Sequence, residues 1–390
     1  MRKTITIGDL GTIITGKTPP TTNKNYYGDY AVFIKPTDIS EQSKYTYETE
    51  EMYSKLAAEK YESNLIPKGA ICVPCIGTIG TKMTMAPCDC YTNQSINSIV
   101  CNENYDNEYV YYLIKNFLPG LKAYNLGTAS GREYVSKSNF EKIELVAEQD
   151  KTIQKRIGVI LSRYDSLIEN NQKQIKLLEE AAQRLYKEWF VNLHFPGHEN
   201  TKIIEGVPEG WEKKKLIDLV NVQYGYAFDG KLFNNNGEGM PILRIRNIPD
   251  GITSDYTTEE ASEDYIVHSG DIVVGMDGIF HINSWSGDDA YLVQRACSFR
   301  PKVERIKGFI FQAIQEPIKY FEKTLVGATV AHLGKKHIDS IELCVPKNFE
   351  LCQPFSKFYN QRQGLLSQIR LLIEARDRLL PKLMSGDIEV

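Results

Sequence analysis

Apolar side chains recur at alternating steps of four and three residues through a long segment near the middle of the chain. The positions of this series are Ile157, Leu161, Tyr164, Ile168, Asn171, Ile175, Leu178, Ala182, Leu185 and Trp189. Such spacing keeps one face of an α-helix against a partner helix, so residues 150–195 are predicted to form a coiled-coil helix rather than an ordinary core helix. Asn171 is the single amide of the series, and a buried amide fixes the register of a helix pair.

A second helix is predicted over residues 351–390, because a related segment returns near the end of the chain. The string QIKLLEEAAQRL at 174–185 corresponds to QIRLLIEARDRL at 368–379. The apolar positions of this second series are Phe358, Leu365, Ile369, Leu372 and Leu379. Arg362 and Arg376 interrupt it. The matching seams predict that the two helices pack on each other, antiparallel, and hold two similar domains apart.

Each predicted helix follows a strand-rich segment, and these two segments resemble each other. The string YTNQSINSIV matches YLVQRACSFR, which sets Gln94 opposite Gln294. The tripeptide Ile-Glu-Leu occurs at 143–145 and again at 341–343. Gly, Pro and Asn turns punctuate both segments, as is typical of short strands joined by tight loops.

The repeat divides the chain into domains. We expect a first strand-rich domain at 1–149, a linker at 196–210 and a second strand-rich domain at 211–350. The predicted fold class is α+β, with two similar α/β domains separated by a long antiparallel two-helix coiled coil and related by a pseudo-two-fold internal repeat.

The string GTIITGKTPP at 11–20 fits the phosphate-loop pattern G-x-x-x-x-G-K-[ST]. A phosphate loop needs its Lys and Thr in the first turn of a helix. Pro19 and Pro20 disfavour helical geometry at Thr18 and Pro19. The interior of the loop, 12–15, is β-branched throughout and suits a strand. We therefore predict a strand followed by a turn instead of a nucleotide site.

Composition adds few constraints. Of the 390 residues, 42% are hydrophobic and 25% charged, and the formal net charge is −4, so any basic surface must be local. No apolar run approaches the ~20 residues of a membrane span. The N-terminus lacks the apolar core of a signal peptide, and we expect a cytoplasmic protein with no membrane contact.

Cysteine and histidine spacing gives little support for a metal site. Cys72 and Cys75 lie in an apolar run that predicts a buried strand, and Cys88 and Cys90 are separated by one residue only. Core packing is the expected role of these side chains, with zinc or a disulfide as the alternatives. His194 and His198 have no Cys or carboxylate at ligand spacing, so no metal is expected.

Sequence signatures of catalysis are missing as well. The chain holds no G-x-S-x-G, no H-E-x-x-H and no Asn/Asp-Pro-Pro-Tyr/Phe string of aminomethyltransferases. The lone E-x-K at 212–214 has no Pro-Asp at a workable distance upstream. A duplicated chain of this kind is predicted to recognise a partner rather than to catalyse a reaction.

Taken in order, the repeated strings resemble the specificity subunit of a Type I restriction-modification system, and the resemblance covers essentially the whole chain. The carriers are TGKTPP (15–20), GTIGTK (77–82), TNQSIN (92–97), the helix at 153–190, PEGWEKKKLIDL (208–219), GDIVVGMDG (270–278), VQRACSFRP (293–301) and RLLPKLMSG (378–386).

This resemblance implies two target-recognition domains, each reading one half of a bipartite double-stranded DNA site. It also implies that the central helices dock two DNA methyltransferase subunits and that restriction (motor) subunits join the assembly. S-adenosylmethionine, ATP and magnesium would then belong to the partners, which methylate adenine after flipping it from the stack, and this chain would hold no catalytic residue.

Candidate DNA contacts follow from side chains suited to phosphates and base edges. In the first domain they are Lys17, Lys35, Thr37, Lys82 and Arg132. In the second domain they are Arg244, Arg246, Asn247, Gln294, Arg295 and Lys335. We expect Arg244 and Arg246 to share one face of a strand. The seam residues of both helices are the candidates for helix pairing and partner docking.

Two other functions remain as alternatives. One is an enzyme, either a phosphate-loop NTPase or a one-chain restriction enzyme. The other is a coiled-coil scaffold that never contacts DNA.

Overall fold

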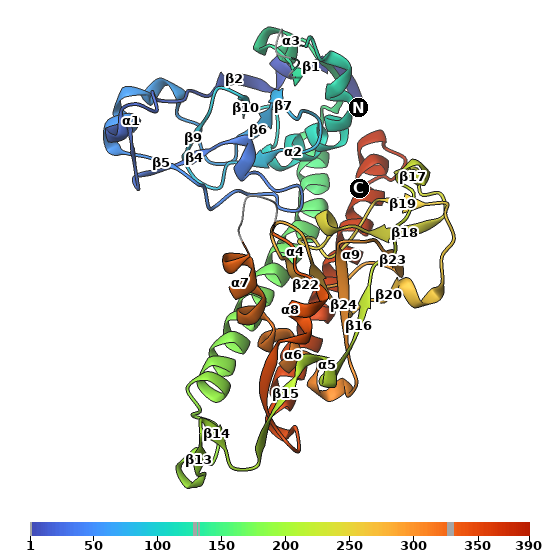
Figure 1. The fold of residues 1–390 in the computed structure, drawn as a ribbon. Helices are drawn as coiled ribbons and strands as arrows, with labels where there is room; N and C mark the ends of the chain where they lie inside the picture. Colours follow the sequence, from blue (N-terminus) through green and yellow to red (C-terminus); the bar gives the residue numbers. More distant parts are fainter. Residues whose placement is uncertain (1, 128–130, 132, 326–330) are drawn as a thin grey trace. The chain divides into compact units, whose positions relative to one another are not determined.

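The computed structural model describes residues 2–127, 131, 133–325 and 331–390 (Figure 1). The chain divides into two compact units. The first unit is Met1–Asn170 with Arg370–Val390, and the second unit is Asn171–Ile369.

The first unit contains two four-stranded sheets and a terminal strand pair. The central sheet has the order β2-β10-β6-β8 and is antiparallel. Its strands are β2 (Gly11–Thr15), β10 (Ile96–Cys101), β6 (Ile71–Pro74) and β8 (Thr84–Met85). The other sheet has the order β3-β5-β4-β9, with β4 and β9 parallel. Its strands are β3 (Tyr27–Gly28), β5 (Met52–Tyr53), β4 (Ala31–Ile34) and β9 (Tyr91–Thr92).

The second unit repeats this topology, with one additional strand, β20, at the edge of its second sheet. Its central sheet, β16-β24-β21-β22, corresponds to β2-β10-β6-β8, and its parallel pair β18–β23 corresponds to β4–β9. The strands are β16 (Val220–Tyr224), β24 (Ala296–Pro301), β21 (Ile272–Gly275), β22 (Ile282–Ser284), β17 (Phe233–Asn234), β19 (Tyr256–Thr257), β18 (Met240–Leu243), β23 (Ala290–Leu292) and β20 (Ile266–Val267). The predicted internal repeat is confirmed.

In each unit a further antiparallel pair leads into a long helix. These pairs are β1 (Arg2–Thr6) with β12 (Glu144–Glu148), and β15 (Trp211–Lys215) with β25 (Glu342–Pro346). The remaining strands are β7 (Ile76–Gly77), β11 (Glu133–Tyr134), β13 (Ile203–Ile204) and β14 (Val207–Pro208). The last two form a hairpin inside the segment expected as a linker.

Shorter helices cover the sheets. They are α1 (Lys55–Lys60), α2 (Asn107–Phe117), α3 (Lys137–Glu141), α5 (Leu216–Leu219), α6 (Lys307–Ala313), α7 (Gln315–Thr324) and α8 (Lys335–Asp339). Asp106 caps α2 by accepting from the Tyr109 N–H at 3.1 Å. The apolar face of α2 joins Ile71 and Val73 of β6 in the core of the first unit. Two 3₁₀ turns, η3 (Pro36–Asp38) and η9 (Ile245–Asn247), follow β4 and β18.

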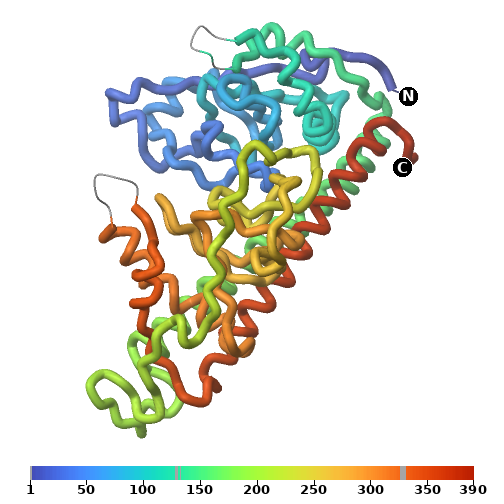
Figure 2. Tube along the Cα trace, turned by 45° about the vertical axis from the view of Figure 1, so that its right-hand side comes forward, coloured from blue at the N-terminus to red at the C-terminus, as the bar shows by residue number. Residues whose placement is uncertain are grey.

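The two predicted long helices are present. They are α4 (Lys151–Tyr186), which continues into a π-helical turn, η6 (Lys187–Val191), and α9 (Gln353–Ser385). Figures 1 and 2 show them side by side along the chain trace. In the first unit the beginning of α4 packs on the end of α9, and in the second unit the order is reversed, so the pairing is antiparallel. Among the described helices none has an apolar stretch that could cross a bilayer.

The seam of α4 is largely the predicted one, whereas that of α9 is offset. Ile157, Leu161, Ile168, Asn171 and Ile175 are buried. On α9 the buried positions that step by three and four include Phe355, Tyr359, Arg362, Ile369, Arg376, Leu380 and Leu383. The two arginines read as interruptions are therefore seam residues.

Each arginine of the α9 seam reaches a carboxylate on α4. In the first unit Arg376 Nη1 lies 2.5 Å from Asp165 Oδ1, and Tyr112 donates to the same carboxylate. Both charged side chains are about 95% buried, with exposures of 4% and 5%. In the second unit Arg362 Nε lies 2.5 Å from Glu179 Oε1. Between these two ion pairs, Asn171 donates to Gln368 at 3.2 Å.

Replacing Arg376 by Met is expected to lower the free energy of unfolding by about 3–5 kcal/mol, because Asp165 is left buried without its cation. Urea unfolding of the full chain measures this change. The double variant Asp165→Leu/Arg376→Met is expected to lose less than Arg376→Met alone, since no charge is stranded.

Arg378→Met is the matched control. It lies on the same helix with 79% of its side chain exposed, in an i,i+4 pair with Glu374 at 2.7 Å. Exposed pairs contribute little, so its unfolding midpoint should stay near that of the parent chain. Equal effects of the two substitutions would contradict a stabilising role for the buried pair.

Candidate nucleic-acid interface

Equivalent 3₁₀ turns close the parallel strands of the two units. In the first unit the Lys35 N–H donates to Asp38 Oδ2 at 2.8 Å. In the second unit the Arg244 N–H donates to Asn247 Oδ1 at 2.9 Å. A short polar side chain that accepts from the backbone three residues earlier favours such a turn. Lys35 and Arg244 therefore occupy equivalent positions of the repeat, so two of the predicted DNA contacts correspond to each other.

The expectation that Arg244 and Arg246 share a strand face is wrong. Strand β18 ends at Leu243, and Arg244 begins the turn. The alternation Arg-Ile-Arg suggested a strand, but Asn247 caps the backbone of Arg244 and turns the chain instead. The side-chain oxygen of Asn247 is thereby engaged in the fold.

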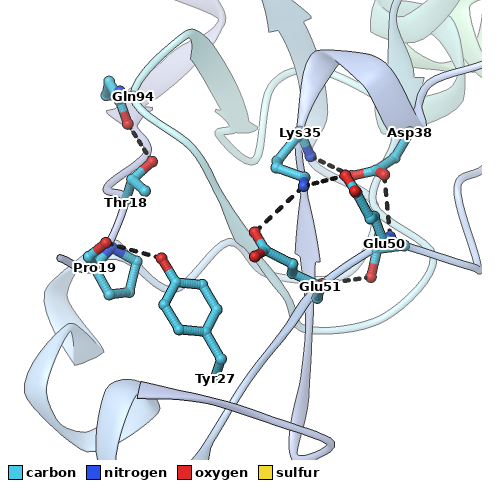
Figure 3. Close-up of polar contacts among 9 residues, drawn as sticks. Thr18, Pro19, Tyr27, Lys35, Asp38, Glu50, Glu51 and Gln94 are labelled. Carbon is cyan, nitrogen blue, oxygen red and sulfur yellow. Dashed lines mark hydrogen bonds and ion pairs between the residues drawn. The ribbon is translucent and has the colours of Figure 1, made fainter. Parts of the chain in front are cut away.

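Lys35 is held by carboxylates. Its Nζ lies 2.6 Å from Glu50 and 3.3 Å from Glu51, and its side chain is 19% exposed (Figure 3). Burial lowers the pKa of Lys35, but the hydrogen bonds to Glu50 and Glu51 outweigh burial and the net pKa is raised. A DNA phosphate would have to replace these carboxylates. Thr37, in the same turn, is exposed.

The two arginines of the second turn differ in their partners. Arg246 forms a fork with buried Asp255, at 2.6 Å from Nη2 and 3.1 Å from Nε, and 58% of its side chain remains exposed. The guanidinium of Arg244 lies 5.2 Å from the centre of the Phe233 ring. Both side chains are therefore fixed at the surface, which lowers the entropy cost of a directed contact.

The glycine of the Gly-Lys-Thr string is required by packing. A Cβ on Gly16 would lie 2.2 Å from the carbonyl oxygens of Thr92 and Asn93. Its counterpart Gly225 would bring a Cβ within 2.1 Å of the Val293 carbonyl oxygen. Strand β2 ends just before Gly16, at Thr15, and no α-helix follows until α1. The predicted strand and turn are confirmed, and the close approach of two backbones explains the pattern.

The turns against which these glycines pack carry the two repeat-related glutamines. Gln94 and Gln294 are both exposed. The Thr18 hydroxyl donates to Gln94 Oε1, while Tyr27 donates to the carbonyl of Pro19 at 2.9 Å (Figure 3). Gln294 donates its backbone N–H to the Tyr226 carbonyl at 2.8 Å and leaves its amide at the surface.

The remaining predicted cations are spread over the surface. Lys17 is exposed directly after Gly16, Lys82 is half-buried beyond β7, and Lys335 is exposed at the start of α8. Arg132 lies outside the described residues. These positions stay predictions, because the structure shows their exposure and not a nucleic acid.

One charged cluster was missed from the sequence. Asp277 lies between Arg295, 3.3 Å away, and His332, 2.5 Å away. Arg295 is a predicted DNA contact, but Asp277 is 18 residues from Arg295 and 55 residues from His332 in the sequence. No local pattern joins the three residues. Only the pairing of distant segments brings the three side chains together.

Core packing is confirmed for Cys72, Cys75 and Cys90, which are buried, and is wrong for Cys88, which is exposed in the bend between β8 and β9. Cys72 and Cys75 are buried in or beside β6, and burial raises the pKa of Cys72 to about 11 and that of Cys75 to about 12. A metal-binding thiol must ionise, and a raised pKa opposes that. Within the described ranges, no three His, Cys, Asp or Glu side chains are grouped to hold a metal ion.

The helix pair keeps apolar side chains at its surface. The remaining predicted seam positions are half-buried: Tyr164, Leu178, Leu185, Leu365, Leu372 and Leu379. Leu177 is 64% exposed and Leu371 58% exposed. A groove beside Leu177 in the second unit is lined by Gln174, Leu178, Gln361, Gly364, Leu365 and Gln368.

Two copies of one fold, with different polar side chains on the same turns, define a two-domain recognition protein. Residues 2–180 and 208–369 match the family described as Type I restriction modification DNA specificity domain. The chain belongs to this family, and neither the fold nor the matches support a phosphate-loop enzyme.

Some similar proteins match nearly the whole chain, and others match one half of it. The chain is 26% identical over 407 residues to the Type I restriction enzyme MjaIX specificity subunit of Methanocaldococcus jannaschii, covering 98% of this chain and 93% of that one. It is 34% identical over 177 residues to the HindI specificity subunit of Haemophilus influenzae, covering 44% and 38%. The fold resembles the crystal structure of the S subunit from M. genitalium, with a TM-score of 0.59, 16% identity and coverage of 98% and 96%.

Gly16→Ala and Gly225→Ala are each expected to lower the free energy of unfolding by about 1–3 kcal/mol, because the added methyl group overlaps a backbone carbonyl. Gly230→Ala serves as the control, since a Cβ there meets no atom within 4 Å. Thermal unfolding of the full chain compares the three. A neutral Gly16→Ala would contradict the packing explanation of this glycine.

Proposed function

We propose that this chain reads the two halves of a bipartite double-stranded DNA site, one half with each target-recognition domain. Catalysis would reside in partner subunits: two DNA methyltransferases bound to the helix pair, and restriction (motor) subunits that join the same assembly. S-adenosylmethionine, ATP and magnesium would be bound by those partners. Because the target is the cell's own DNA, the assembly would work in the cytoplasm.

One observation carries this proposal: the two units keep the same turns and exchange the side chains on them. Lys35 corresponds to Arg244, and Asp38 to Asn247, on equivalent 3₁₀ turns with the same capping hydrogen bond. Two readers of different base sequences need this combination, because register is fixed by the fold while base contacts are chosen by the side chains.

The exposed leucines support a pair of identical partners. Leu177 and Leu371 occupy equivalent positions of the repeated strings QIKLLEEAAQRL and QIRLLIEARDRL. Both are more than half exposed, at 64% and 58%, whereas the exposed Leu167 of α4 has no apolar counterpart on α9. An exposed apolar residue repeated with the fold fits two copies of one protein docking in equivalent ways.

The first test is on the DNA target. A methylome of the host with this gene should show one methylated motif made of two specific halves and an unread spacer, and deletion of the gene should remove it. The complex with its methyltransferase should bind that duplex with an affinity that falls steeply with salt. A host methylome that is unchanged by the deletion would overturn the proposal.

A matched nucleotide experiment excludes the rival enzyme. Lys17→Ala should leave ATP binding by the isolated chain unchanged at its background level, since Gly16 and Lys17 form no helix N-terminus. Tight ATP binding that Lys17→Ala abolishes would favour the NTPase.

The second test is on partner docking. Leu177→Asp and Leu371→Asp should each weaken methyltransferase binding by about 2 kcal/mol or more if these leucines are anchor residues, and the double variant should recruit none. Leu167→Asp is the control, because Leu167 is 51% exposed on α4 but its repeat counterpart is Gln361. Analytical ultracentrifugation of mixtures measures the stoichiometry, and equal loss with the control would contradict the docking sites.

A further inference from the structure

In the second unit the carboxylate of Asp277 contacts two exposed side chains, those of Arg295 and His332. Its Oδ2 lies 3.3 Å from Arg295 Nε, and its Oδ1 lies 2.5 Å from His332 Nδ1. Asp277 itself is 21% exposed, whereas Arg295 is 67% and His332 61% exposed. The acid is thus placed beneath the two side chains that face solvent.

Backbone hydrogen bonds fix the segments that carry this cluster. The Met276 N–H donates to the Arg295 carbonyl at 2.8 Å, and the Leu333 N–H donates to the Met276 carbonyl at 2.7 Å. Arg295 has a φ of +71°, which is uncommon for a residue other than glycine and marks a constrained position. The guanidinium therefore starts from a rigid base.

The first unit has the same two backbone hydrogen bonds without the charges, although its backbone is not left-handed at the position of Arg295. There the Cys75 N–H donates to the Ser95 carbonyl at 2.7 Å, and the Val135 N–H donates to the Cys75 carbonyl at 2.8 Å. The positions equivalent to Asp277, Arg295 and His332 are Ile76, Ser95 and Tyr134. Since these backbone hydrogen bonds form with neutral residues here, the charged trio of the second unit is not needed to make them.

The chemistry of the trio fits a base edge better than a phosphate. The ion pair engages Nε of Arg295, and the two Nη groups carry four further N–H donors in a rigid fork. A fork of this kind matches the O6 and N7 acceptors of guanine. Asp277 neutralises much of the charge, which weakens attraction to a phosphate but keeps the directed donors.

We propose that Arg295, positioned by Asp277, reads a guanine in the half-site of the second target-recognition domain. This inference rests on the proposed function. Arg295 would contact the base, and Asp277 would act as a positioning residue together with His332.

The test uses the assembled methyltransferase complex and the motif found for the parent chain. Duplex libraries with every position of both half-sites randomised are methylated and sequenced. Arg295→Ala and Arg295→Lys are each expected to reduce discrimination at one guanine of one half-site by about 5- to 150-fold, because neither residue can form the bidentate contact. Asp277→Asn should reduce discrimination at that same position by a smaller factor, and the other half-site should be unaffected in all three.

Two controls separate the outcomes. Ser95→Ala, at the equivalent position of the first unit, should leave the second half-site unaffected. Lys335→Ala removes an exposed cation from α8 and should at most weaken all sequences alike. A uniform loss with Arg295→Lys would assign Arg295 to a phosphate, and an effect at a base other than guanine, or at no position, would also overturn the inference.

Failure of the proposed function is distinguishable from failure of this inference. Without a bipartite motif for the parent chain, the function itself is wrong. With such a motif but unchanged preferences in the Arg295 variants, only the assignment of Arg295 is wrong. Arg295→Lys keeps the charge and most of the bulk, and thermal unfolding of the complex shows whether any variant has lost its fold.

Discussion

The antiparallel pairing of α4 with α9 is the interaction on which the fold depends, and two buried arginines determine its register. Arg376 meets Asp165 in the first unit, and Arg362 meets Glu179 in the second. A sliding of one helix by a single turn would separate Arg376 from Asp165 and Arg362 from Glu179, and Asp165 would then be buried without its cation. The energy of a buried ion pair is modest, but the penalty for breaking one is large, so such pairs specify alignment more than they add stability.

These ion pairs also break the symmetry of the repeat. The aligned strings pair Arg376 with Ala182, and the same offset, continued six residues toward the N-terminus of the strings, pairs Arg362 with Ile168. The arginine of each ion pair thus corresponds to an apolar residue in the other copy of the repeat. A fully symmetric seam would permit either half of α4 to pair with either half of α9. The unequal seam allows only one alignment of the two helices. Buried polar groups specify the register of coiled coils in the same way.

The sequence predicted most of what is local and little of what joins distant segments. The seam of α4 is visible because most of its buried positions are apolar, although Gln154, Asp165 and Asn171 are buried as well. The seam of α9 was placed off register, because hydrophobic spacing cannot show that Arg362 and Arg376 meet carboxylates 183 and 211 residues away. Gly16 was predicted correctly to lie outside a nucleotide site, but its close contact with the turn at Asn93 appears only in the fold. Arg244 and Arg246 were misplaced, because a single capping amide outweighed strand alternation.

Three of the predicted DNA-contacting cations, from both units, each form an ion pair with a carboxylate. Lys35 contacts Glu50 and Glu51, Arg246 contacts Asp255, and Arg295 contacts Asp277. In a chain with a net charge of −4, such pairing keeps the attraction to any DNA backbone low. The ion pairs nevertheless hold the N–H donors in place, so these side chains lose little conformational entropy when they bind a base edge of matching geometry. This balance favours sequence discrimination. When the non-specific affinity for DNA is weak, the difference in binding free energy between correct and incorrect bases determines where the protein binds.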